Sequence, residues 1–77
     1  MGRYLRWSPE EFAYLLSHPE LSAQVLSDLL PRRTVGAIEA ARGGIDQYRN
    51  GRPVAGLLSR MGIAMLEERE PNIAVRH

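Results

Sequence analysis

The stretch LPRRTVGAIEAARGG, residues 30–44, holds the signals that decide the fold class. Proline disfavours helical geometry in the residue before it, so Pro31 ends any helix that precedes this stretch. Thr34 is a favoured N-cap, and the residues after it carry apolar side chains at helical spacing. The pattern predicts a turn at Arg32-Arg33 followed by a helix over about residues 35–48. The apolar positions of this predicted helix are Ile38, Ala41, Ile45 and Tyr48.

Two further helices are predicted before this stretch. In WSPEEFAYLL, residues 7–16, Ser8 is an N-cap, proline occupies the first helical position, and Glu11 completes a capping box. Pro19 ends this first helix. A second helix is expected over about residues 20–30. Its apolar stripe consists of Leu21, Val25, Leu26, Leu29 and Leu30.

A fourth helical segment is predicted after a turn at Asn50-Gly51, which stops the helix that begins at Thr34. This segment opens with Pro53 and runs to about Glu70, and the proline that follows ends it. Residues 71–77 are expected to form a flexible tail. Helix signals follow one another along the chain and strand signals do not, so we predict an all-α fold.

The composition indicates one small, soluble, intracellular domain. The 77 residues contain no cysteine, which excludes disulfides and thiolate metal sites. No apolar run approaches the roughly 18 residues of a membrane span, and the first residues lack the apolar core of a signal peptide. We therefore expect a cytoplasmic protein, in a bacterial or host cell, with no membrane partner.

The basic charge comes from arginine alone, which bears on the kind of partner. Ten arginines and no lysine stand against nine acidic residues, for a formal net charge of +1. Arginine binds phosphate and guanine through a planar fork, yet a nucleic-acid binder more often has a clear basic surplus. Arginine-only basicity with plentiful alanine and glycine is typical of a GC-rich bacterial genome. The placement of the arginines therefore matters more than their number.

Residues 6–49 resemble the Myb/SANT-like branch of homeodomain-like helix-turn-helix proteins. The resemblance implies a trihelical DNA-binding domain over residues 1–51, with a short N-terminal arm and a third helix that enters the major groove. Residues 52–70 would add a C-terminal helix to this bundle. The resemblance is carried by Trp7-Ser8-Pro9-Glu10-Glu11, by Leu29-Leu30-Pro31, and by Arg33-Thr34 with Ala37-Ile38.

The resemblance also implies which residues would contact DNA bases. The family's base-contacting positions are occupied here by Gly36, Glu39 and Ala40, with Gly43 one turn further along. Family members usually place Asn or Lys at these positions, whereas the small residues here leave a nearly bare surface. That surface would let the DNA backbone or another helix approach closely. Glu39 is suited either to accept a hydrogen bond from cytosine or to pair with Arg42.

The arginines around the predicted turn suggest contacts to the DNA backbone. Arg32, Arg33 and Thr34 lie beside the positive end of the third helix and would clamp a phosphate. The alternative is a solvated turn in which Arg33 pairs with an acid such as Asp28. Arg42 is a candidate for a guanine or phosphate contact, or for a salt bridge within the domain.

Two terminal segments extend the predicted interface. Arg3 and Arg6 lie on the N-terminal arm, which would enter the minor groove or else cover the core. The C-terminal helix would either cap the core or pair with a second copy or a protein partner, since methionines adapt to irregular surfaces. The residues of that possible dimer or partner interface are Val54, Leu57, Leu58, Met61 and Met65.

Enzyme activity is not expected. His18 and His77 are far apart and lack metal-ligand spacing, and no glycine-rich loop between a strand and a helix cradles a phosphate. We expect no cofactor, no metal and no small-molecule substrate. The sequence instead predicts a small DNA-binding protein, a transcriptional regulator or an accessory factor of a phage or mobile element, at the nucleoid. A SANT-like protein-interaction module without DNA binding is the alternative.

Overall fold

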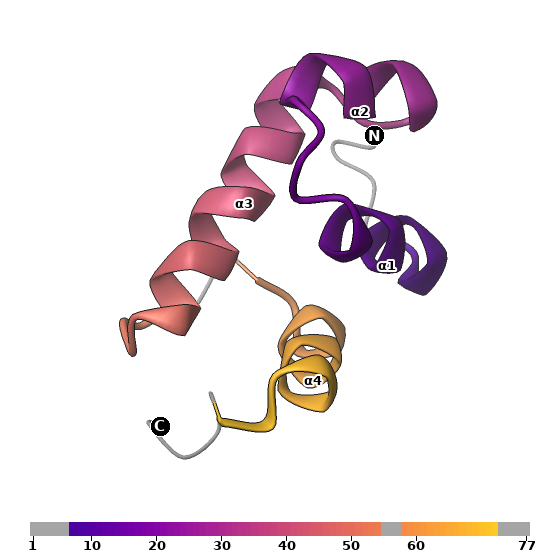
Figure 1. Cartoon of the computed structure of the whole chain (residues 1–77). Coiled ribbons are helices and arrows are strands. Elements are labelled where there is room, and N and C mark those ends of the chain that lie inside the picture. Colours follow the sequence, from indigo (N-terminus) through magenta and orange to yellow (C-terminus); the bar gives the residue numbers. More distant parts are fainter. Residues whose placement is uncertain (1–6, 55–57, 73–77) are drawn as a thin grey trace, which may run out of the picture. The chain divides into compact units, whose positions relative to one another are not determined.

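The computed structural model describes residues 7–54 and 58–72, and every regular element in them is helical. The four helices are α1 (Pro9–Ser17), α2 (Ala23–Leu29), α3 (Val35–Arg49) and α4 (Arg60–Arg69), labelled in Figure 1. No strand occurs in these two described ranges, so the predicted all-α class is confirmed. None of the described helices combines the length and apolar composition needed to cross a membrane.

Helix α1 begins with the capping box that the sequence predicts. The Ser8 hydroxyl accepts from the Glu11 N–H at 3.1 Å, and Glu11 Oε1 accepts from the Ser8 N–H at 3.1 Å. Each side chain thereby satisfies a backbone donor that a helix start otherwise leaves unpaired. The helix ends at Ser17, ahead of Pro19, as expected.

Helix α2 is shorter than predicted, and only one residue of its predicted apolar stripe is buried. It begins at Ala23 because the Ser22 hydroxyl caps it, accepting from the Val25 N–H at 3.2 Å. Of the predicted apolar stripe only Leu26 is buried, whereas Val25 is 41% exposed and Leu29 is 51% exposed. Val25 and Leu29 are four residues apart, so they project from the same side of α2, at the exposed edge of the face that carries Leu26.

Helix α3 ends as the sequence predicts. Gly51 has a φ of +74°, in the left-handed region that glycine adopts without a steric cost. The Gly51 N–H donates to the Tyr48 carbonyl at 3.0 Å, and the Arg52 N–H donates to the Gln47 carbonyl at 2.9 Å. These two bonds form a Schellman motif, which satisfies the last carbonyls of the helix.

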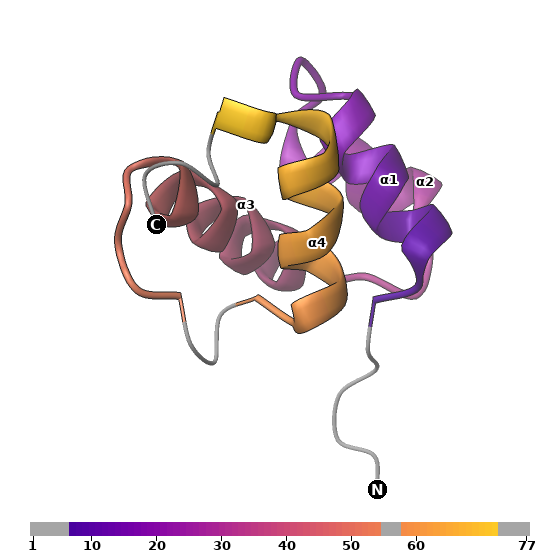
Figure 2. The same cartoon turned by 90° about the horizontal axis from the view of Figure 1, so that it is seen from below.

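Helix α4 begins seven residues later than predicted. Residues 53 and 54 are not helical, and the helix starts at Arg60, where the Ser59 hydroxyl accepts from the Gly62 N–H at 3.1 Å. Pro53 therefore does not start the helix. The start is set by Ser59, whose hydroxyl is the acceptor for the backbone N–H of the first turn. The predicted flexible tail lies largely outside the described residues, but Pro71 and Asn72 are helical after a break at Glu70 (Figure 2).

The chain divides into two compact units, Met1–Ile38 and Glu39–His77. The division lies within α3. The predicted apolar face of this helix is confirmed, because all four of its residues are buried. The buried apolar residues are Phe12, Leu15, Leu26 and Ile38 in the first unit, and Ala41, Ile45, Tyr48, Val54 and Leu66 in the second.

In the second unit, α4 runs across the later part of α3 (Figures 1 and 2). The Tyr48 hydroxyl donates to a carboxylate oxygen of Glu67. The Arg49 guanidinium forms an ion pair with Glu70, with Nη2 and Oε2 2.6 Å apart. Both contacts join the end of α3 to the end of α4. The Glu67 hydrogen bond raises the pKa of Tyr48, because it stabilises the protonated phenol.

Candidate nucleic-acid interface

The turn before α3 is a hydrogen-bonded β-turn. The Arg33 N–H donates to the Leu30 carbonyl at 2.8 Å, which places Pro31 at the second turn position, where its fixed φ is favourable. Thr34 then caps α3, since its hydroxyl accepts from the Ala37 N–H at 3.0 Å. The predicted turn and N-cap are both confirmed.

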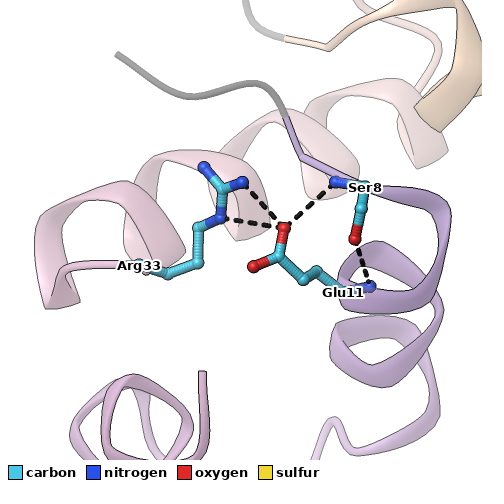
Figure 3. Close-up of polar contacts among 3 residues, drawn as sticks. All are labelled: Ser8, Glu11 and Arg33. Carbon is cyan, nitrogen blue, oxygen red and sulfur yellow. Dashed lines mark hydrogen bonds and ion pairs between the residues drawn. The ribbon is translucent and has the colours of Figure 1, made fainter. Parts of the chain in front are cut away.

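The Arg33 side chain turns inward from this turn. The residue is only 4% exposed. Its Nη2 lies 2.7 Å and its Nε 3.2 Å from the same oxygen, Oε1 of Glu11, as Figure 3 shows. Its guanidinium carbon lies 4.8 Å from the centre of the Trp7 ring, within cation–π range. Arg33 is therefore held by Glu11 in the first turn of α1 and by Trp7, the residue before the N-cap of that helix.

These contacts favour the internal alternative for Arg33 over a phosphate contact. A guanidinium this deeply buried, with a charged partner, does not reach a DNA phosphate without leaving both Glu11 and the Trp7 ring. The alternative of an internal ion pair applies, but its acid is Glu11, 22 residues earlier in the chain, rather than Asp28. Asp28 accepts instead from the Gln24 amide at 3.4 Å.

Glu11 therefore has two roles, as the capping-box carboxylate of α1 and as the partner of Arg33. The hydrogen bond from Arg33 is the largest influence on this carboxyl group and lowers its pKa from the usual 4.5. Desolvation acts in the opposite direction, and the bonds with Ser8 assist the lowering. The Glu11 carboxylate therefore stays ionised at neutral pH and paired with Arg33 within the fold.

The other residues predicted at the interface are mostly exposed. Arg32, Thr34 and Gly36 are exposed in the first unit. In the second unit Glu39, Ala40 and Gly43 are exposed, and Arg42 is half-buried and engaged in contacts. The predicted solvent-facing positions of this helix are thus confirmed as exposed.

Two of these exposed positions are glycines that the fold does not need. A Cβ at Gly36 would meet nothing closer than the Thr34 hydroxyl at 3.9 Å, and a Cβ at Gly43 would meet nothing within 4 Å. Neither glycine has a positive φ. A glycine inside a helix costs roughly 1 kcal/mol relative to alanine, so packing within the chain does not explain this choice.

The predicted interface on the C-terminal segment is only partly exposed. Val54 is 6% exposed and belongs to the core of the second unit, which corrects its assignment to a partner surface. Leu58, Met61 and Met65 are half-buried, in keeping with the core-cap alternative. Leu57 lies outside the described residues, as do Arg3 and Arg6 of the predicted arm.

The exposed apolar pair on α2 was missed at the sequence level. Val25 and Leu29 fit a buried helical stripe, and the sequence offers no signal that separates them from Leu26. In the ranges that the structure covers, acidic and histidine side chains form no cluster of three that would hold a metal ion. His18 Nδ1 lies 3.1 Å from Glu20 Oε2 at the exposed end of α1.

Comparisons of the chain with protein-family models, with curated proteins and with solved structures found no match. The Myb/SANT-like resemblance therefore stays a prediction from the residues that carry it. The turn at Arg32 and the exposed residues of α3 are the candidate site.

Proposed function

We propose that this chain binds duplex DNA with the turn at Arg32 and the start of α3, as a small transcriptional regulator or an accessory factor of a phage or mobile element. On this proposal it works in the cytoplasm at the nucleoid, in a bacterial or host cell. Arg32 is exposed and immediately precedes the residues that anchor and cap α3. A phosphate beside it would meet the guanidinium and the backbone N–H groups at the positive end of the helix.

The observation that carries the proposal is the bare surface at Gly36. This position is exposed in the first turn of α3, four residues after Arg32, and the chain leaves open space where a side chain would stand. An external molecule that approaches the backbone closely gives a reason for glycine here, since packing within the chain does not. A sugar–phosphate backbone seated between Arg32 and this glycine meets both requirements.

The second unit, taken by itself, has further candidate contact residues on its own part of α3. Ala40 and Gly43 are exposed and small, so they read little beyond a thymine methyl, and Glu39 is suited to the cytosine amine. Arg42 would supply a further contact to phosphate or guanine. Base readout by one copy would therefore be modest. A second copy, or the N-terminal arm with Arg3 and Arg6, would sharpen it.

Fluorescence anisotropy of a labelled mixed-sequence duplex, titrated at two or more salt concentrations, tests the proposal. Arg32→Ala should weaken binding and reduce the slope of log K against log salt by about 0.9, the value for one phosphate contact. Arg60→Ala is the matched control, because it removes the same charge from an exposed residue on α4. Absence of binding by the wild type in low salt, or equal losses in both variants, would contradict the proposal.

Gly36→Ala provides an independent test of the bare surface. Alanine should stabilise α3 by up to about 1 kcal/mol, because the new Cβ meets no close neighbour. The same Cβ should weaken DNA binding if the backbone of α3 approaches the duplex. Tighter folding with undiminished binding would remove Gly36 from the interface.

A protein-interaction module is the second candidate, and the exposed pair Val25 and Leu29 favours it. Two large apolar side chains on the same side of a short helix are suited to an apolar partner surface. A Val25→Ser/Leu29→Ser double variant should then lose self-association, measured by sedimentation velocity, while its helical circular dichroism is kept. If neither DNA binding nor self-association is found in the wild type, the search moves to other protein partners.

A further inference from the structure

We propose that Arg33 is a positioning residue, which orients the DNA-contacting turn from inside and does not itself contact phosphate. This inference rests on the proposed DNA-binding function and identifies the residue that fixes the conformation of its site. It assigns Arg32 and Arg33, two adjacent arginines of identical chemistry, to different tasks.

The side chain, the main-chain N–H and the main-chain carbonyl of Arg33 each have a hydrogen-bond partner in the first unit. Its side chain is bound by Glu11 of α1, and its N–H donates to the Leu30 carbonyl at 2.8 Å. Its carbonyl accepts from the Ser27 hydroxyl of α2 at 2.9 Å. The residue directly before the N-cap of α3 is therefore fixed at both main-chain groups and at the end of its side chain.

The anchor is shared with the cap of α1. Glu11 Oε1 accepts from three N–H groups, those of Ser8 at 3.1 Å and of Arg33 Nε and Nη2 (Figure 3). The Trp7 ring lies against the guanidinium and also meets Phe12 edge-on, with ring centres 5.9 Å apart. Because Phe12 is buried, the chain of contacts runs from the core through α1 to the turn.

This anchoring determines what the neighbouring residues present to solvent. Arg32 and Thr34 flank Arg33 directly, and both are exposed while the residue between them is buried. Fixing the middle residue limits the conformations of the turn, so less ordering is needed when a ligand binds. The turn is thus held in one shape before DNA arrives.

Glu11→Gln separates the two roles by the sign of its effect on DNA affinity. The substitution raises the net charge by one and removes the carboxylate that holds Arg33. If Arg33 positions the turn, affinity in the anisotropy titration should fall by roughly tenfold, about the effect of losing one charge-assisted hydrogen bond. If Arg33 contacts phosphate, its release should instead strengthen binding. The matched control is Glu10→Gln, which makes the same charge change at an exposed residue of the same helical turn.

Amide hydrogen exchange, measured without DNA, reports the positioning role by itself. In Glu11→Gln, exchange of the Ala37 N–H at the start of α3 should rise more than exchange of the Gly62 N–H, its counterpart in α4. A rise at Ala37 no larger than the rise at Gly62 would show the global loss of stability alone and would overturn a specific effect on the turn. This readout separates the two failures, because absence of DNA binding by the wild type defeats the proposed function and leaves the exchange data to decide the positioning.

Arg33→Lys keeps the inference testable if Glu11→Gln unfolds. Lysine keeps the charge, and as a point charge it still binds phosphate, but it lacks the planar group that lies over Trp7 and gives two bonds to Glu11. We expect weaker DNA binding at unchanged net charge. Retained affinity in this variant, or affinity in Glu11→Gln equal to or above that of Glu10→Gln, would overturn the inference.

Discussion

Replacing Glu11 with Gln removes the charge that faces Arg33 but keeps a carbonyl oxygen able to accept the Ser8 N–H. The side chain of Arg33 is 3% exposed and that of Glu11 is 15% exposed, so solvent screens the pair little. Removing one partner of a buried ion pair costs roughly 3–5 kcal/mol, because the other charge is left without compensation. We expect a loss near the lower end, about 3 kcal/mol, since glutamine still offers one acceptor.

A loss of this size is large for a 77-residue chain, whose total stability is expected at roughly 4–12 kcal/mol. The melting temperature should fall by about 12–24 °C, since 1 kcal/mol corresponds to about 4–8 °C in a domain of this length. Thermal and urea unfolding followed by circular dichroism measure the change. Glu10→Gln, exposed in the same helical turn, should stay within about 1 kcal/mol of the wild type. Equal stabilities of the two variants would refute the reasoning.

Three further predictions concern pH, the end of α3 and the contact between α3 and α4. The folded pKa of Glu11 lies below its usual 4.5, so the stability that this carboxylate gives the fold is present above pH 4.5 and is lost as pH falls through the folded pKa. Acid unfolding of the wild type should show this loss, and acid unfolding of Glu11→Gln should not. Gly51→Ala should destabilise the chain by about 1–2 kcal/mol through its positive φ, whereas Gly43→Ala, at an open helical position, should stabilise it by up to about 1 kcal/mol in the same urea titrations. Tyr48→Phe should lower the melting temperature by removing the bond to Glu67. Because the folded pKa of Tyr48 is raised above its usual 10.0, this contribution is fully present below pH 10 and is lost as pH rises through the folded pKa. The difference in melting temperature from the wild type should therefore shrink in alkaline melts.

The helix boundaries show which parts of the fold can be predicted from the sequence. The capping box of Ser8 and Glu11 and the stop at Gly51 were predicted, because each depends on partners within a few residues. The predicted starts of α2 and α4 are wrong, although their N-caps, Ser22 and Ser59, also depend on partners only three residues away. In both cases an apolar pattern or a proline further upstream gave a competing start, and serine is common enough outside caps that its position alone does not decide.

The role of Arg33 was beyond the sequence for a different physical reason. Its partner lies 22 residues away, and Glu11 already had a complete local explanation as a capping residue. One carboxylate oxygen that accepts both a cap donor and a guanidinium is apparent only when the turn and α1 are seen together. The same geometry places the two neighbouring arginines in different environments. Arg33 is anchored inside, and Arg32 is left as the exposed charge before α3. A count of arginines in the sequence would therefore give this turn two exposed guanidinium groups, whereas the structure exposes one.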